Sequence, residues 1–423
     1  DLQFMDSLFT FELGEYQKLV DAALQKATED HIIERIWNHD YLVWADSNQE
    51  ISNRLGWLDI ADRMQKEVPG LRDFAERVKQ DGIEHVLLLG MGGSSLAPEV
   101  FSRIFGNTEG FPSLSILDST DPRAVKSKLD SHDPTKTLYI VATKSGGTIE
   151  TISFFKTFYN QALVNLGEEE VGQHFIAITD PNSKLAEMGN ILGFREIFLN
   201  DPNLGGRFSA LSFFGLVPAA LLGMDIETLL YRANDMARYC KVENGQENPG
   251  AKLGFSIALL SAEGMDKLTF FAPAELAPFG DWVEQLIAES TGKSGKGIVP
   301  VLGNDWADIP SFVGDRVLVE FTLGASDQTI KQLPNPYIQL RWEDKYDIGA
   351  QMFLWEFAIA VAGHSMVIHP FNQPNVESAK VRARDMMSTF QEQGQLSSLE
   401  RDKASAQSID MFISNAEPSS YIS

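Results

Sequence analysis

The chain has 423 residues and a formal net charge of −24, which argues against nucleic acid or an anionic lipid surface as a partner. Hydrophobic residues make up 43% of it, enough for a sizeable core, yet no run approaches the ~18 apolar residues that a membrane-spanning helix needs. A single cysteine, Cys240, excludes an internal disulfide framework and multi-cysteine zinc sites, and the acidic first residues do not fit a signal peptide, so the sequence predicts a cytoplasmic protein.

The length exceeds the ~100–200 residues of a usual domain, so two domains or one elaborate α/β body are expected. The pattern is helical over residues 12–39 and 51–80, with Trp44 and Trp57 expected to pack the connection. Short apolar strands then alternate with helices. The strands are predicted at 85–89, 113–118, 137–142, 173–179 and 194–199, and the helices at 96–105, 122–129, from 150 and at 183–192. This alternation predicts a parallel sheet with helices on both faces.

The second half of the chain repeats the alternation. Residues 213–222 form a predicted apolar helix, and residues 226–262 are predicted to be mostly helical and to join the halves. The later strands are predicted near 267–272, 315–322, 336–342 and 364–368, and the helices at 278–291, 346–363 and from Pro374. No low-complexity linker divides the halves, so we expect them to pack together with an active cleft between them.

The stretch 137–152 runs from a buried strand through a loop of glycine and hydroxyl residues into a helix. Backbone N–H groups at a helix N-terminus and the helix dipole favour an anion, and Thr143, Ser145 and Thr148 would add O–H donors. The stretch therefore predicts an anion pocket. An ordinary βα turn with a hydroxyl cap is the alternative, in which Lys144 is simply solvated.

The loop Gly90-x-Gly92-x-x-Ser95 partly fits the fingerprint of a dinucleotide-binding enzyme, with Asp118 at the end of the next strand. Ser95 stands in place of the third glycine, however, and Asp118 lies somewhat far along the chain. A dinucleotide site needs one pyrophosphate cradle, whereas this chain has two hydroxyl-rich loops. The sequence therefore disfavours a nicotinamide dinucleotide.

Two charged residues outside these loops are candidates for chemistry. Arg207 follows a pair of glycines, where a permanent cation could face an anion or an enolate-like oxygen; a surface arginine is the alternative. Glu289 shares a predicted helix face with Trp282 and Leu286. Burial on such a face raises the pKa of a carboxylate toward that of a general base, whereas a partly exposed helix-end glutamate, for which Glu284 is a candidate, would be inert.

Five segments occur in the order seen in phosphoglucose isomerases, and together the chain resembles that family over about residues 40–385. The segments are Gly90-Met-Gly-Gly-Ser-Ser, Thr143-Lys-Ser-Gly-Gly-Thr-Ile-Glu-Thr, Gly205-Gly-Arg-Phe-Ser, Glu289-Ser-Thr-Gly-Lys and Gln373-Pro-Asn-Val-Glu-Ser-Ala-Lys380. Residues 37–58 and Phe279-Gly-Asp-Trp are most similar to the isomerase part of bifunctional transaldolase/phosphoglucose isomerases.

This resemblance implies an α/β fold of two sugar-isomerase (SIS) subdomains, each a mostly parallel sheet with helices on both faces, an αβα sandwich. The expected division is a helical N-terminal segment 1–66, subdomains 67–235 and 236–390, and a C-terminal tail 391–423. It also implies the interconversion of glucose 6-phosphate and fructose 6-phosphate in glycolysis and gluconeogenesis, without a metal or an organic cofactor. Members of the family are commonly dimers with the site near the subunit interface, which makes a homodimer an expectation here.

The resemblance further implies a role for each matching residue. Glu289 matches the base that moves a proton between C2 and C1 of the open-chain sugar. Arg207 matches the cation that stabilises the cis-enediol(ate) intermediate, and Lys380 matches the lysine that assists ring opening. The residues that match the substrate- and phosphate-binding positions are Gly92, Ser94, Thr143, Lys144, Ser145 and Thr148.

Two departures from the family pattern concern ring opening. Conventional members carry a ring-opening histidine before the helix that corresponds to 350–363, where this chain has Gly349-Ala-Gln351-Met. The last motif normally begins Asn-Pro-Phe-Asp-Gln but here reads His369-Pro-Phe-Asn372-Gln. His364 and His369 could supply the step, or they could be structural histidines.

The ends of the chain and its altered motifs leave further alternatives. The sequence starts at Asp1 without a methionine and stops at Ser423 as a strand-like pattern begins. Processing, a cloning boundary and a cut from a longer polypeptide are the alternative explanations, and the resemblance makes a transaldolase-containing chain the expected longer polypeptide. A non-catalytic SIS module that binds a sugar phosphate as a sensor or regulator is the second functional hypothesis. Glu289 argues against it, whereas the altered histidine region and the apparent truncation argue for it. Thr291 replaces an asparagine common in conventional members, which leaves tolerance of mannose 6-phosphate open.

Overall fold

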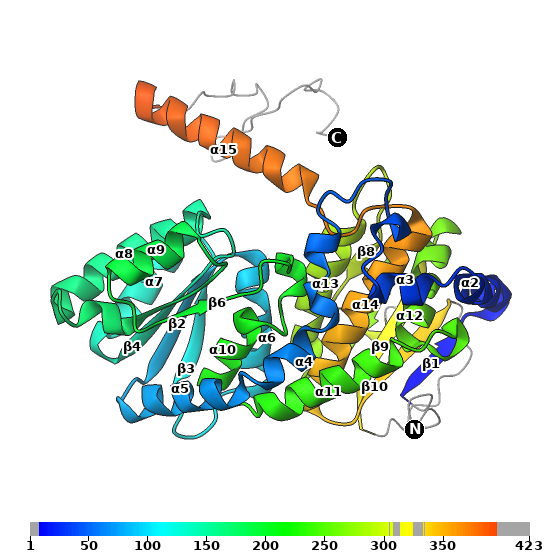
Figure 1. The fold of residues 1–423 in the computed structure, drawn as a ribbon, viewed down its shortest axis with the longest axis horizontal. Helices are drawn as coiled ribbons and strands as arrows, with labels where there is room; N and C mark the ends of the chain where they lie inside the picture. The colour runs from blue at the N-terminus through cyan, green and yellow to red at the C-terminus, as the bar shows by residue number, and fades with distance from the viewer. Residues whose placement is uncertain (1–7, 304, 308–313, 325–332, 334, 396–423) are drawn as a thin grey trace. The chain divides into compact units, whose positions relative to one another are not determined.

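The computed structural model describes residues 8–303, 305–307, 314–324, 333 and 335–395. The chain divides into two compact units, residues 1–372 and 373–423. The first unit holds two five-stranded sheets with their helices, and the second holds helix α15 (Pro374–Gln393), which is described by itself (Figure 1). In the described part of the chain, no helix is both long and apolar enough to cross a membrane. The expected subdomain boundaries stay predictions.

The first sheet has the strand order β3-β2-β4-β5-β6, and all its strands are parallel. The strands are β2 (His85–Gly90), β3 (Ser113–Leu117), β4 (Thr137–Ala142), β5 (Phe175–Thr179) and β6 (Glu196–Leu199). The connecting helices are α6 (Leu96–Phe105), α7 (Pro122–Ser131), α8 (Ile149–Leu166) and α9 (Lys184–Ile191). The predicted alternation of strands and helices is confirmed.

Alternate residues of the central strands enter two different cores. Leu88 and Ile140 belong to the main core, which also takes in α6, whereas Leu89 and Val141 belong to a smaller core beneath α8. Successive side chains of a strand point to opposite faces, so both faces of β2 and β4 are buried. This burial explains why the two strands are runs of apolar residues rather than alternating ones.

Strands β2 and β4 lie side by side, and Gly90 pairs with Ala142 at their carboxyl ends. In the sheet, β3 lies on one side of β2 and β4 lies on the other side. The chain therefore reverses its direction of winding between β2 and β4. Ligands of open α/β sheets bind outside the carboxyl ends of the strands at such a point. The loops 91–95 and 143–148 both leave the sheet there.

The second sheet has the order β1-β10-β9-β7-β8, with β1 antiparallel to β10 and the other pairs parallel. Its strands are β1 (Phe9–Glu12), β7 (Lys267–Phe271), β8 (Val299–Val301), β9 (Arg316–Leu323) and β10 (Tyr337–Trp342). The sequence patterns did not predict β1 and β8, which are short edge strands. They carry too few residues to show a period.

The predicted strand over 364–368 is wrong. Residues up to Met366 form the last turn of α14 (Ile348–Met366), and Val367 ends the helix in a left-handed conformation with φ 54°. A short apolar run does not distinguish a buried helix from a strand, because both lack polar positions. Here the run continues a helix that is buried along almost its whole length.

Helix α14 is the buried centre of the second half of the first unit. It packs against α11, α12 and α13. The rings of Trp37 and Trp57 lie against Phe353 and Phe357, and the indole of Trp44 donates to the carbonyl of Ala360 at 2.7 Å. The remaining helices are α2 (Gln17–Glu29), α3 (Ile32–Trp37), α4 (Ile60–Gln65), α5 (Val68–Gln80), α10 (Phe213–Leu221), α11 (Ile226–Tyr239), α12 (Pro249–Ala262) and α13 (Ala277–Thr291).

One carboxyl group of α14 lies in the core. The side chain of Glu356 is fully buried, and neither carboxyl oxygen has a hydrogen-bond partner among the described residues. Burial raises the pKa of Glu356 well above its usual range, because the charged form would lose its hydration. The folded protein therefore keeps this group protonated at pH values at which the unfolded chain ionises it.

We expect the stability of Glu356→Gln relative to wild type to increase as pH rises. The folded pKa lies above the unfolded pKa, so wild type loses stability as pH rises between them, by up to about 1.4 kcal/mol per pH unit. Urea unfolding of both proteins at pH 5 and pH 8 measures this difference. Glu284→Gln, at an exposed glutamate of α13, is the control. An equal trend in both variants would contradict the prediction.

Candidate active site

The first loop after β2 is shaped by two glycines. Gly92 has φ +54°, which a side chain would strain, and it opens the short 3-10 turn Gly92–Ser94. A Cβ on Gly93 would lie 2.4 Å from the carbonyl oxygen of Gly206, so the two backbones are in direct contact. Ser94 is half-buried in this turn. The loop is therefore fixed against the turn that carries Arg207.

The second loop places hydroxyl groups at the start of α8. Thr148 is the N-cap residue of α8, but its hydroxyl hydrogen-bonds the Thr143 hydroxyl at 2.8 Å instead of a helix N–H. The Ser145 hydroxyl is exposed and accepts from the N–H of Gly147 at 3.3 Å. The first N–H groups of a helix have no partner inside it. Donors of both kinds therefore lie within one short loop, as a proposed anion site requires.

Lys144 is held inside this loop by an ion pair. Its ammonium contacts the carboxylate of Asp180 and donates to the carbonyl of Pro202 at 3.0 Å. Burial raises the pKa of Asp180, and the hydrogen bond from Lys144 opposes that shift. The lysine is half-buried, so the solvated lysine of the alternative interpretation is not what the structure shows.

Arg207 lies in the 3-10 turn Gly206–Phe208 and is only 4% exposed. Its Nη1 donates to the Ser290 hydroxyl and, at 3.0 Å, to the carbonyl of Pro370. Its Nη2 donates to the carbonyls of Phe371 and Asn372 at 3.2 and 3.1 Å. Burial lowers the pKa of Arg207 to about 10, which leaves it charged at neutral pH.

Glu289 lies in the last turn of α13 and faces Arg207. Arg207 Nε is 3.5 Å from one carboxylate oxygen of Glu289, and Gln285 donates to the other at 3.1 Å. Trp282 and Leu286 are buried on the same helix, as predicted, whereas the Glu289 side chain keeps 35% exposure. A Cβ on Gly92 would lie 3.1 Å from the Gln285 amide nitrogen, so the first glycine loop borders this pair. A carboxylate base beside a buried cation can move a proton next to a carbonyl group and stabilise the resulting oxyanion.

Lys293 belongs to the same cluster, although sequence reasoning did not single it out. Its ammonium donates to the carbonyls of His369 and Asn372, both at 2.7 Å. Burial lowers the pKa of Lys293 to about 7, and the charge of Arg207 acts in the same direction. The sequence did contain one indication of its importance, because Lys293 is the last residue of the motif Glu289-Ser-Thr-Gly-Lys.

The two candidate ring-opening histidines both bond to the main chain. His369 Nε2 lies 2.9 Å from the carbonyl of Gln49, and its Nδ1 accepts from the N–H of Phe371 at 3.2 Å. This pattern assigns the proton to Nε2, and burial lowers the pKa of His369. His364 Nδ1 lies 2.8 Å from the carbonyl of Val43. Ring opening by either histidine stays a prediction.

Two other residues of interest lie in different surroundings. Gln351, in the stretch where conventional members carry histidine, is buried in α14, and its side-chain oxygen has no hydrogen-bond partner within the described ranges. Lys380 lies in α15, which belongs to the second unit. The role assigned to Lys380 therefore stays a prediction.

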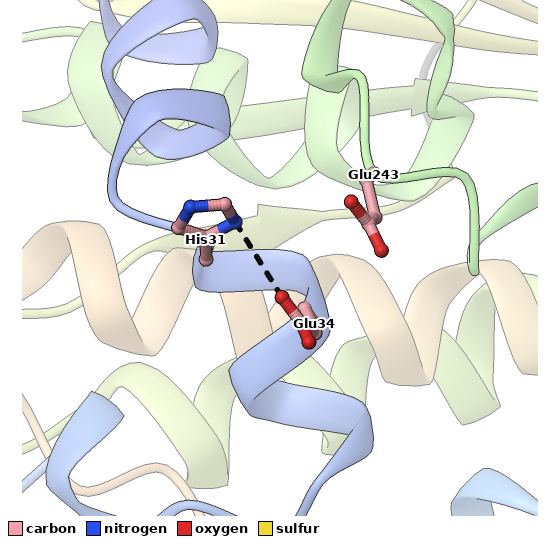
Figure 2. Close-up of side chains that lie close together, drawn as sticks. All are labelled: His31, Glu34 and Glu243. Carbon is pink, nitrogen blue, oxygen red and sulfur yellow. Dashed lines mark ion pairs between the residues drawn. The ribbon is translucent and has the colours of Figure 1, made fainter.

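A further group of side chains lies on elements that do not carry this site. Figure 2 shows His31, Glu34 and Glu243, whose potential metal-ligating atoms lie within 4.8 Å of one another. All three are exposed, and His31 Nδ1 pairs with Glu34 at 3.4 Å. This contact is an ordinary pair at i,i+3 on a helix surface, with a second carboxylate nearby.

We expect Gly93→Ala to destabilise the protein by roughly 1–3 kcal/mol, because the added methyl group forces two backbones apart. Gly206→Ala is the matched control, since nothing lies within 4 Å of a Cβ built there and its φ is not positive. Thermal and urea unfolding of both variants measure the effect. Equal stability of the two variants would show that the close approach of the loops is not required.

Comparison with known proteins shows which family shares this arrangement. The family model for phosphoglucose isomerase matches residues 52–298. A glucose-6-phosphate isomerase of Mycoplasmopsis pulmonis is 29% identical over 384 residues, which cover 77% of this chain and 88% of the relative. A glucose-6-phosphate isomerase of Carboxydothermus hydrogenoformans is 27% identical over 390 residues, which cover 77% of this chain and 83% of the relative.

Solved structures agree at the level of the fold. A glucose-6-phosphate isomerase from Chlamydia trachomatis superposes with a TM-score of 0.76 at 19% identity, over 91% of this chain and 89% of that chain. A hypothetical protein from Thermus thermophilus superposes with a TM-score of 0.72 at 24% identity, over 90% of this chain and 100% of that chain. The family model covers more than half of the sequence and includes both glycine loops, Arg207 and Glu289. This chain belongs to the phosphoglucose isomerase family.

Proposed function

We propose that this protein is an aldose–ketose isomerase that interconverts glucose 6-phosphate and fructose 6-phosphate through a cis-enediol(ate) intermediate. The observation that carries the proposal is the pair of Glu289 and Arg207, whose nearest side-chain atoms are 3.5 Å apart beside the first glycine loop. Membership of the family and relatives named glucose-6-phosphate isomerase support the choice of substrate.

The loop 143–148 is the proposed phosphate site. It combines the N-terminus of α8 with the hydroxyls of Thr143, Ser145 and Thr148. Because Lys144 is paired with Asp180, its charge is partly offset, and dipoles of N–H and O–H groups supply most of the attraction. Gly92 and Ser94 would contact the sugar from the neighbouring strand end.

Proton transfer is assigned to Glu289. Its carboxylate takes the proton from C2 of the open-chain aldose, and negative charge develops on the enediolate oxygen. Arg207 is already desolvated and fixed by four acceptors, so it stabilises that charge without reorganising. The hydroxyl proton of O2 passes to O1, and Glu289 then returns its proton to C1 while the C2=O double bond forms. One carboxylate therefore serves both carbons, and no redox cofactor enters the scheme.

Other parts of the sequence-based interpretation extend this proposal. Assistance of ring opening by Lys380, a homodimer, a transaldolase-containing neighbour and a cytoplasmic location stay predictions. A sensor that binds sugar phosphate without turnover is the competing function. A coupled assay of fructose 6-phosphate conversion, run beside a binding measurement, separates the two functions.

We expect Glu289→Gln to slow exchange of the C2 proton with solvent by about two to four orders of magnitude, because glutamine keeps the shape but removes the base. Binding of a phosphorylated aldonic acid should change far less. Proton exchange followed by NMR in deuterated buffer measures the loss. Glu284→Gln is the control on the same helix; if it abolishes exchange while Glu289→Gln does not, the base is misassigned.

We expect the double variant Ser145→Ala, Thr148→Ala to bind sugar phosphate more weakly by roughly 1–3 kcal/mol, since two hydroxyl donors to a charged group are removed. Calorimetric titration with glucose 6-phosphate measures the change. Ser153→Ala, one turn into α8, is the control because its hydroxyl already donates to Ile149 at 2.7 Å. Equal affinity of wild type for glucose and glucose 6-phosphate would rule out the phosphate site.

A further inference from the structure

Isomerisation of a cyclic sugar phosphate begins with opening of its ring, and this step needs an acid. The stretch in which conventional relatives carry the ring-opening histidine contributes the buried Gln351 here. We infer that Lys293 is the acid that protonates the ring oxygen, an inference that rests on the proposed function.

The hydrogen bonds of Lys293 suit a proton donor that has to stay in place. An ammonium group has three N–H donors, and two of them go to the carbonyls of His369 and Asn372, both at 2.7 Å. No acceptor for the third N–H is found among the residues that the structure describes. After that proton is given away, the neutral amine still has two N–H groups for the same two carbonyls. The same two hydrogen bonds can therefore form in both protonation states, although the neutral amine donates them more weakly.

The amine lies in the same cluster as the proposed base. The carbonyl of Asn372 accepts from both Lys293 and Arg207, and Arg207 Nε is 3.5 Å from Glu289. Lys293 is half-buried, so it can reach a bound ligand and still exchange protons with water. A sugar held against Glu289 would therefore lie in the cluster to which the Lys293 ammonium belongs.

The surroundings also set the proton affinity of the amine. The charged and titratable groups that face it are Arg207, Glu289, Glu50 and His369. Burial lowers the pKa of Lys293 to about 7 and Arg207 adds to the effect, whereas the two glutamates oppose it. Both protonation states are therefore populated at neutral pH, which suits a general acid that is regenerated in each turnover.

The two histidines are less suited to this step. Both ring nitrogens of His369 already bond to main-chain groups, at Gln49 and Phe371. His364 bonds to the carbonyl of Val43, and its ring packs edge-on against Phe255. Either ring would have to break a main-chain hydrogen bond in order to exchange a proton through that nitrogen.

Two protons move when the ring opens. The Lys293 ammonium gives a proton to the ring oxygen O5 while the C1–O5 bond breaks, so O5 becomes a hydroxyl group. The proton of the C1 hydroxyl leaves to water, and the electron pair of that O–H bond forms the C1=O double bond. A proton from water then restores the ammonium of Lys293, and the open-chain aldehyde passes to Glu289.

Ring opening can be measured apart from isomerisation, because opening and reclosing interconverts the α and β anomers of glucose 6-phosphate without using Glu289. NMR exchange spectroscopy of the two anomers measures this rate. We expect Glu289→Gln to lose isomerisation but to keep catalysed anomer exchange. Lys293→Met and Lys293→Arg should lose anomer exchange by about 10²–10⁴-fold. Arginine can still donate to the two carbonyls, but it does not give up a proton at neutral pH.

Two comparisons separate an acid from a structural lysine. Lys296→Met is the matched control, since Lys296 donates to the carbonyl of Met366 at 2.6 Å and should keep anomer exchange. In wild type, the exchange rate should fall as pH rises through about 7, because only the protonated amine donates. Lys293→Arg should fold and should bind a phosphorylated aldonic acid as wild type does.

Three outcomes would overturn the assignment. The first is that Lys293→Arg retains anomer exchange. The second is that His369→Ala loses anomer exchange while both Lys293 variants keep it. The third is that Lys293→Arg folds but no longer binds the acyclic acid. Failure of the proposed function is distinguishable, because wild type itself would then not isomerise glucose 6-phosphate, whether or not it binds the acyclic acid.

Discussion

The buried guanidinium of Arg207 holds together three segments that are far apart in the sequence. Removing such a cation from water costs several kcal/mol unless its donors are used and its charge is balanced. Here the donors go to Ser290 and to the carbonyls of residues 370–372, and Glu289 balances the charge. The turn 206–208, the end of α13 and the segment after α14 therefore depend on one side chain.

The same turn also fixes the first sheet to this cluster. Gly206 meets Gly93 backbone to backbone, so the loop that leaves β2 has its position set by the turn that carries Arg207. The neighbouring loop, 143–148, leaves the paired strand β4. A ligand with an anionic end on α8 and a reacting carbon at Glu289 would thus contact elements of both halves of the chain.

Local features were predictable from the sequence, and distances between them were not. Strands β2 and β4 are apolar runs, and the glycine and hydroxyl residues that follow them mark turns, so the two loops follow from neighbouring residues alone. The pairing of Arg207 with Glu289 depends instead on the packing of the second half against the first. Resemblance to a family supplied their roles, but the hydrogen bonds from Arg207 to residues 370–372 needed coordinates.

Lys293 could not be recognised from the sequence for the same reason. A lysine that follows a glycine at a helix end has the pattern of a solvated side chain. Its ammonium group is desolvated here because the segment 369–372, which is distant in the sequence, packs its carbonyls against it.

The net charge of −24 gives the arrangement of cations a physical reason. A sugar phosphate approaches this protein against its overall field, so attraction has to be local. Yet Lys144 is paired with Asp180, and the charges of Arg207 and Lys293 are directed to main-chain carbonyls. These three cations are therefore anchored by groups of the protein itself, and in the proposed scheme the N–H and O–H dipoles at the start of α8 hold the phosphate. Dipoles that are already oriented need no reorganisation when an anion arrives, so the proposed phosphate site would not depend on the overall charge of the protein.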